Sequence, residues 1–227
     1  MDLSNFPKYP LSKFGPKGYN RHALFRSFIV MKAEKLCKVT DLLSFLDTNP
    51  YIAYLCGFDP FKTLPFYSVF QRFIKILNND ILKDIMKSQV LKLTELEFID
   101  SSFISCDATP IFANTKQSNP KSFASYKFNK ENHPKLDPDC KLGVHTASNS
   151  HNEKKFEYYW GYKNVVITDS ISGLPIAEIT VTADLADSSI IIDFLKETDK
   201  WFSLKEAYFI ADKAYDTKDI HNFIDYP

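Results

Sequence analysis

The sequence has little glycine and lacks the glycine-rich motifs of several common enzyme sites. Only six of its 227 residues are glycine, and the patterns G-x-S-x-G, G-x-G-x-x-G and G-x-x-x-x-G-K do not occur. These absences argue against serine hydrolases and against folds that hold a nucleotide phosphate on a glycine-rich loop.

Cysteine is also scarce, and its spacing is uninformative for metal or disulfide chemistry. The four cysteines are far apart in the chain and form no C-x-x-C pair. We therefore expect reduced thiols rather than a disulfide framework or a zinc site.

The segment MDLSNFPKYP has no apolar core of a signal peptide, and no apolar run approaches the roughly 18 residues that span a bilayer. These features predict a cytoplasmic protein without a membrane partner.

Neither sign of charge is in excess, but the two parts of the chain differ. The chain has 28 basic and 28 acidic residues; residues 1–99 carry 14 basic and 9 acidic side chains, which leaves 14 and 19 for residues 100–227. A basic front and an acidic back suit a DNA-contacting region followed by a carboxylate metal site. A chance split is the alternative interpretation.

The pattern of the sequence changes twice along the chain. Residues 1–19 contain several prolines and glycines and predict an irregular basic arm. Residues 20–95 show helical periodicity with short breaks and predict an all-α domain. Residues 96–227 predict an α/β domain, in which residues 113–158 lose periodicity and are expected to form a mobile loop.

Two aspartates share one local setting. Asp107 ends the apolar run FISCD, and Asp212 ends the run AYFIAD. If these runs are neighbouring strands of a sheet, both carboxylates can face one ion, and oxygen ligands of this kind suit Mg²⁺ or Mn²⁺. For each aspartate alone, a turn or a helix cap is an equally ordinary role.

Several motifs in order resemble one family. The segments SCDATPIFAN, WGYKNVVITDSISGLPIAEITVTADLADSS and YFIADKAYDT resemble the central part of bacterial insertion-sequence DDE transposases of the insertion-sequence-four/five-like superfamily. The resemblance implies a ribonuclease-H-like mixed sheet with flanking helices, preceded by an all-α DNA-binding domain. It also implies metal-dependent DNA cleavage and strand transfer, with Asp107 and Asp212 as ligands of Mg²⁺ or Mn²⁺. The implied partners are terminal inverted repeats, target DNA and a second copy of the chain.

One feature departs from the family pattern. The third acid of the family is a glutamate on a helix well after the second aspartate, and no glutamate follows Asp212 before Pro227. We therefore expect a truncated copy with an incomplete catalytic domain. The alternatives are a catalytically inactive fragment that binds element ends and a non-functional remnant.

A second set of residues is expected to contact DNA. On the segment LPFYSVFQRF these are Ser68, Gln71 and Arg72, which would face a groove if the third and fourth helices form a helix-turn-helix. Arg21, Arg26 and Lys213 could contact phosphates, and a solvated surface is the alternative for each. In the predicted loop, lysines 116, 121, 127, 130, 135 and 141 among the aromatic residues 123, 126 and 128 could hold the DNA backbone and stack on unpaired bases, and a solvated lysine-rich loop is an equal alternative. The histidines 133, 145 and 151 are expected to be merely exposed.

Overall fold

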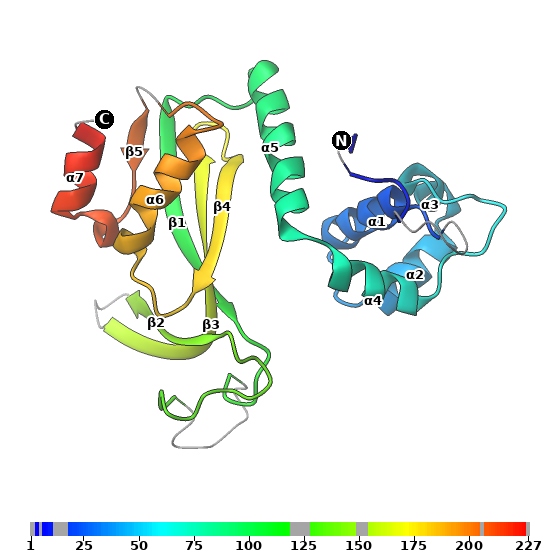
Figure 1. Cartoon of the computed structure of the whole chain (residues 1–227), viewed down its shortest axis with the longest axis horizontal. Coiled ribbons are helices and arrows are strands. Elements are labelled where there is room, and N and C mark those ends of the chain that lie inside the picture. Colours follow the sequence, from blue (N-terminus) through cyan, green and yellow to red (C-terminus); the bar gives the residue numbers. More distant parts are fainter. Residues whose placement is uncertain are drawn as a thin grey trace. The chain divides into compact units, whose positions relative to one another are not determined.

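The computed structural model describes residues 3–4, 6–10, 18–118, 128–148, 154–204 and 207–225 and divides the chain into two compact units, residues 1–89 and 90–227 (Figure 1). The first unit contains four helices, α1 (Arg21–Ala33), α2 (Val39–Thr48), α3 (Pro50–Cys56) and α4 (Tyr67–Ile76), and α5 (Asn79–Glu95) runs across the boundary. The second unit contains β1 (Phe103–Phe112), β2 (Lys141–Ser148), β3 (Lys154–Asp169), β4 (Pro175–Thr182), α6 (Asp187–Asp199), β5 (Tyr208–Ile210), the 3₁₀-helix η1 (Lys213–Tyr215) and α7 (Lys218–Asp225).

Local signals set the ends of the helices in the first unit. The side chain of Asn20 accepts hydrogen bonds from the amides of His22 and Ala23 and so caps α1. Pro50 opens α3, and Gly57 ends it with a φ of 106°, a conformation that favours glycine. The core of the unit is apolar and rich in leucine and phenylalanine; its most buried members include Leu24, Leu42, Leu46, Phe70 and Phe73.

Part of the segment predicted as an irregular arm is built into this core. Leu3 is 5% exposed and Phe6 is 1% exposed, and both belong to the apolar cluster of the helical unit. The ring of Phe6 stacks on His22, and the guanidinium of Arg21 lies 4.6 Å from its centroid. Residues 1–2, 5 and 11–17 lie outside the described part of the chain. The arm therefore contributes packing as well as charge.

The second unit is a mixed five-stranded sheet in which four strands have the order β2-β3-β1-β5, and β4 pairs with β3 outside this order. β1 is antiparallel to β3 and parallel to β5. The long strand β3 pairs with β2 along its first half and lies between β1 and β4 along its second half. Val165 and Ile167 of β3 and Ile191 and Phe194 of α6 are buried, which gives the sheet an apolar face.

Gly161 marks the point where β3 changes partners. A Cβ atom at this position would lie 2.0 Å from the carbonyl oxygen of Ile111 on β1. Real Cβ atoms do not approach a backbone oxygen so closely, so only glycine allows this backbone contact. This close approach fixes β1, the strand that carries Asp107, against β3.

The structure contradicts the prediction of one continuous loop over 113–158. This range contains β2 and the start of β3, which pair from Lys141 with Gly161 to Ser148 with Lys154. Ala113, Cys140 and Trp160 are buried together beneath the hairpin. His133, expected to be merely exposed, contacts Trp160 edge-on and bonds through Nε2 to the carbonyl of Cys140 at 2.7 Å. Of the other residues named in this range, Lys121, Phe123, Tyr126, Lys127 and His151 lie outside the described residues.

A buried carboxylate closes the β3–β4 hairpin. Asp169 is 1% exposed and accepts hydrogen bonds from the amides of Asp100, Ile171 and Ser172 and from the Ser172 hydroxyl. Burial alone would raise the pKa of Asp169, but the Ser172 hydroxyl and the three amides lower it below the usual value. The turn itself uses Gly173 at a φ of 71°.

Among the described helices of both units, none has the length and apolar character to cross a membrane.

Candidate functional site

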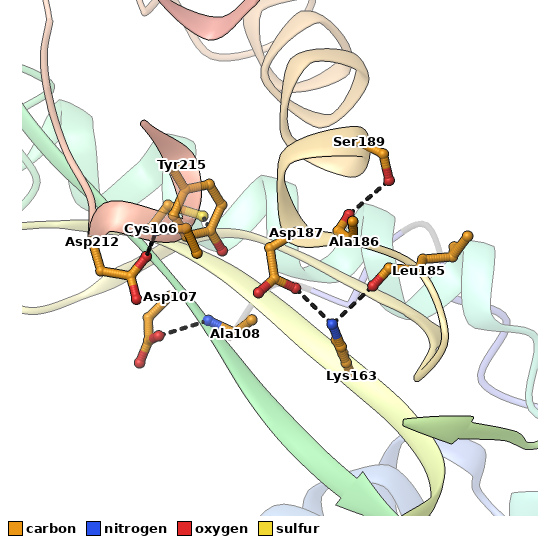
Figure 2. A network of polar contacts seen from close by, with 11 residues as sticks. Cys106, Asp107, Ala108, Lys163, Leu185, Ala186, Asp187, Ser189, Asp212 and Tyr215 are labelled. Atoms are coloured by element: carbon orange, nitrogen blue, oxygen red, sulfur yellow. Dashed lines mark hydrogen bonds and ion pairs between the residues drawn. The ribbon is translucent and has the colours of Figure 1, made fainter. Parts of the chain in front are cut away.

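The sheet brings Asp107 and Asp212 to the same level, Asp107 on β1 and Asp212 just beyond the neighbouring parallel strand β5. The β1–β5 ladder pairs Phe103 with Tyr208 and ends with Ser105 opposite Ile210. Asp107 lies two residues after Ser105, and Asp212 lies two residues after Ile210. If the register of the ladder is continued, the two aspartates therefore lie opposite one another. Figure 2 shows the two side chains next to each other, Asp107 on β1 and Asp212 at the start of η1.

Asp107 lies within β1 rather than at its end. The sequence predicts a strand ending at Asp107, whereas β1 continues to Phe112 because residues 104–112 pair with β3. Alternation along the strand buries Cys106 and exposes Asp107. The Asp107 carboxylate accepts one hydrogen bond through Oδ1, from the amide of Ala108 at 2.8 Å.

Asp212 lies just beyond β5, at the start of η1. Its Oδ1 accepts a hydrogen bond from the amide of Ala214 at 2.8 Å, so the residue caps the 3₁₀-helix. The side chain is exposed, as are its neighbours Ala211 and Lys213. Within the described residues, the hydrogen bonds of both aspartates use Oδ1, which leaves each Oδ2 available to a ligand.

A buried contact links the segments that carry the two aspartates. The thiol of Cys106 on β1 lies 3.8 Å from the hydroxyl of Tyr215 in η1 and donates a weak hydrogen bond to it. Burial raises the pKa of the Cys106 thiol to about 11, and burial together with Cys106 raises the pKa of Tyr215 well above its usual value. Both groups are therefore uncharged at neutral pH.

A third carboxylate lies at the start of α6, where Lys163 of β3 holds it. The Lys163 ammonium donates to Asp187 Oδ1 at 2.9 Å and to the carbonyl of Leu185 at 2.8 Å, and both side chains are largely buried (Figure 2). The N-cap residue of this helix is Ala186, and Asp187 in its first turn pairs with Lys163. The pairing of Lys163 with Asp187 has no local sequence signal, because it joins two separate elements.

The residues at this site fit part of a divalent-cation site. Two exposed carboxylates, one on β1 and one just beyond the adjacent β5, supply the hard oxygen ligands that Mg²⁺ and Mn²⁺ prefer, and both ions keep several waters as further ligands. Among the residues that the structure describes, no three His, Cys, Asp or Glu side chains are grouped closely enough to hold a metal ion. The geometry therefore supplies two candidate ligands, Asp107 and Asp212.

The candidate DNA-reading residues lie together on α4. Ser68, Gln71 and Arg72 are exposed, whereas Phe70 and Phe73 on the opposite side of the helix are buried. The connection from α3 to α4 spans residues 57–66 and is longer than the three- or four-residue turn of a helix-turn-helix. α4 therefore exposes the three predicted residues, but α3 and α4 are not joined as in a helix-turn-helix motif.

The three other candidate phosphate contacts differ in their surroundings. Arg21 is partly buried over Phe6, and burial lowers the pKa of its guanidinium. Arg26 donates to the carbonyl of Cys56 at 3.4 Å. Both arginines therefore have a role in holding the helical unit together, which the sequence pattern does not reveal. Lys213 is exposed directly beside Asp212.

Comparison with known proteins gives one family and one solved structure. Residues 98–226, more than half of the chain, match the family model described as "Transposase DDE domain". The structure titled "Mos1 transposase paired-end complex with left transposon end" matches with 13% identity and a TM-score of 0.30, covering 94% of this chain and 59% of that chain. This chain therefore spans less than two thirds of the length of that relative. No curated protein gives a significant match.

Proposed function

The chain belongs to the transposase DDE domain family, and from this premise we propose that it acts in DNA transposition as an insertion-sequence transposase of the four/five-like superfamily. In this proposal the second unit is a ribonuclease-H-like catalytic region and the helical unit binds DNA. The substrates are the terminal inverted repeats of an element and a target DNA, and the active form on DNA is a homodimer.

The observation that carries this proposal is the register of β1 and β5. It brings two aspartates that are 105 positions apart to the same level of one sheet. Turns and caps account for each aspartate separately, but they give no reason for the two carboxylates to face the same space. A shared divalent cation does give such a reason.

The proposed roles follow from the positions of the side chains. Asp107 and Asp212 would hold Mg²⁺ or Mn²⁺ through the carboxylate oxygens that lack a hydrogen bond in the described structure. When bound, such an ion activates a water or a 3′-hydroxyl and stabilises the leaving oxygen of a phosphodiester. Lys213, exposed beside Asp212, would contact a DNA phosphate near the ion.

In the first unit, the exposed face of α4 would read DNA. Ser68, Gln71 and Arg72 offer hydrogen-bonding groups on one side of a helix that is anchored by buried phenylalanines. Arginine and glutamine are residue types that recognise base edges in the major groove. Arg21 and Arg26 would add phosphate contacts only through the donors that their contacts within the chain leave available.

A second candidate function is DNA binding without cleavage. It is favoured by the division of the chain into two units, because the exposed Ser68, Gln71 and Arg72 lie in the helical unit and the two aspartates lie in the sheet unit. DNA binding by the helical unit would then not depend on chemistry at Asp107 and Asp212.

Mn²⁺ binding to the full chain tests the metal site. Electron paramagnetic resonance of free and bound Mn²⁺ should show one class of site. Asp107→Asn and Asp212→Asn should each weaken the affinity for Mn²⁺ by at least about tenfold, because even mutation of a residue that only orients a metal ligand can have an effect of this size. Asp219→Asn, an exposed aspartate on α7, is the matched control and should bind like the wild type. Equal binding by all four proteins would refute the assigned ligands.

Cleavage then separates the two candidate functions. The wild type is incubated with a fluorescent duplex in Mn²⁺, and binding is followed over increasing salt. Steeply salt-dependent binding with cleaved product supports the transposase, whereas the same binding without product supports the binding protein.

A further inference from the structure

The segment that carries Asp212 has few contacts of its own. Pairing of β5 with β1 ends at Ile210, two residues before Asp212. From Ala211 to Ala214 every side chain is exposed, and Tyr215, which is 4% exposed, is the first buried side chain after the strand. The backbone of Asp212 therefore lies between the end of β5 and Tyr215, in a turn that also contacts α6.

Tyr215 reaches the strand of the other aspartate. Its hydroxyl meets the thiol of Cys106, the residue directly before Asp107, and its ring packs edge-on against Phe209 of β5 at 6.5 Å between centroids. The same side chain thus contacts both strands that position the two carboxylates. The turn that it anchors is short: Asp212 Oδ1 bonds to the amide of Ala214, and the amide of Tyr215 bonds to the carbonyl of Asp212 at 3.1 Å.

We propose that Tyr215 is a positioning residue, which holds Asp212 level with Asp107 by packing η1 against Cys106 and Phe209. This inference rests on the proposed function, because its consequence is the alignment of two metal ligands. Tyr215 touches neither substrate nor metal; it acts through the turn that begins at Asp212.

The test compares two tyrosines that each lose a hydroxyl. Tyr215→Phe removes the contact with Cys106 and keeps the ring. Tyr162→Phe removes the 2.8 Å hydrogen bond from the Tyr162 hydroxyl of β3 to Asp137 and serves as the matched control. Two quantities are measured on the full chain: hydrogen exchange of the Ala214 amide by NMR and the affinity for Mn²⁺.

We expect Tyr215→Phe to speed exchange at Ala214 and to weaken Mn²⁺ binding by about tenfold, the lower end of the range for groups that orient a metal ligand. Tyr162→Phe should change the exchange rate at Ala214 and the affinity for Mn²⁺ by less than about twofold, even if it lowers the melting temperature as much as Tyr215→Phe does. In Cys106→Ala the same loss should appear, and the double variant should be no worse than either single variant.

Wild-type exchange and wild-type Mn²⁺ affinity in Tyr215→Phe would overturn the inference, and so would an equal loss in Tyr162→Phe. If Asp107→Asn binds Mn²⁺ as the wild type does, the proposed metal site is wrong and the positioning role falls with it. That result is distinguishable, because it is obtained without any change at Tyr215.

Discussion

The helical unit and the sheet unit bury different kinds of groups. Among the described residues of the helical unit, the buried side chains are almost all apolar, and the only buried polar one is Ser27, which bonds to the carbonyl of Leu24. The sheet unit buries Asp169 with its four donors and a backbone contact at Gly161. The candidate base-reading residues Ser68, Gln71 and Arg72 therefore rest on a core that does not depend on them, whereas the candidate metal ligands lie in a framework of specific contacts.

The largest expected effect tests the backbone contact of the sheet. Gly161→Ala should lower the free energy of unfolding of the second unit by about 3 kcal/mol, because the new Cβ must push against the carbonyl of Ile111. Displacement of β1 should also reduce Mn²⁺ binding at Asp107. Chemical denaturation of the full chain, with NMR signals assigned to each unit, measures the change separately in the two units.

Gly173→Ala is the matched control for this substitution. Gly173 has a φ of 71° and nothing within 4 Å of an added Cβ, so the change should cost only about 1 kcal/mol, the strain of a left-handed conformation. A similar loss for both glycines would show that the contact of Gly161 with Ile111 is not a tight one.

The next largest effect concerns the buried carboxylate. Asp169→Asn should cost about 2 kcal/mol at neutral pH, because an amide cannot accept all the hydrogen bonds that the carboxylate receives. The pKa of Asp169 is lowered in the folded protein. Its carboxylate therefore stabilises the fold above the unfolded-state value of about 4, and this contribution is lost as the pH falls through the lower folded-state value.

The difference between wild type and Asp169→Asn should consequently shrink as the pH falls from 7 toward about 3. Denaturation curves at several pH values check this, with the signals of the helical unit as the internal reference. A difference that stays constant with pH would mean that the hydrogen bonds do not favour the charged carboxylate.

These contrasts also explain what could be predicted from the sequence. Some helix ends and turns have a local signal in the sequence, such as Pro50 at the start of α3, Gly57 at its end and Gly173 in the β3–β4 turn. The β2–β3 hairpin was missed, because its polar residues show no alternation. It is stabilised instead by the packing of Trp160 of β3 against Cys140 and the distant Ala113. The burial of Phe6 was missed for the same reason, since its partners lie on α1 and α4.

The candidate site was predictable to a different degree. The local setting of Asp107 and Asp212 identified them as a pair, but only the non-local register of β1 and β5 brings them to one level. The link from Cys106 to Tyr215 and the pair of Lys163 with Asp187 join elements far apart in the sequence. No periodicity or cap signal encodes such contacts.

The smallest expected effect on stability is in the helical unit. Arg72→Ala should change the free energy of unfolding by less than about 0.5 kcal/mol, because Arg72 is exposed on α4 and the core beneath consists of Phe70 and Phe73. The same variant should bind duplex DNA more weakly. If Arg72 contacts a phosphate, the slope of log affinity against log salt should fall by about one; if it contacts a base edge, sequence preference should weaken instead.

A loss of both stability and DNA binding in Arg72→Ala would contradict the comparison of the two units, since it would make Arg72 part of the packing on which the helical unit depends. Unchanged binding at unchanged stability would remove this face of α4 from the proposed DNA surface and leave the fold of the unit as described.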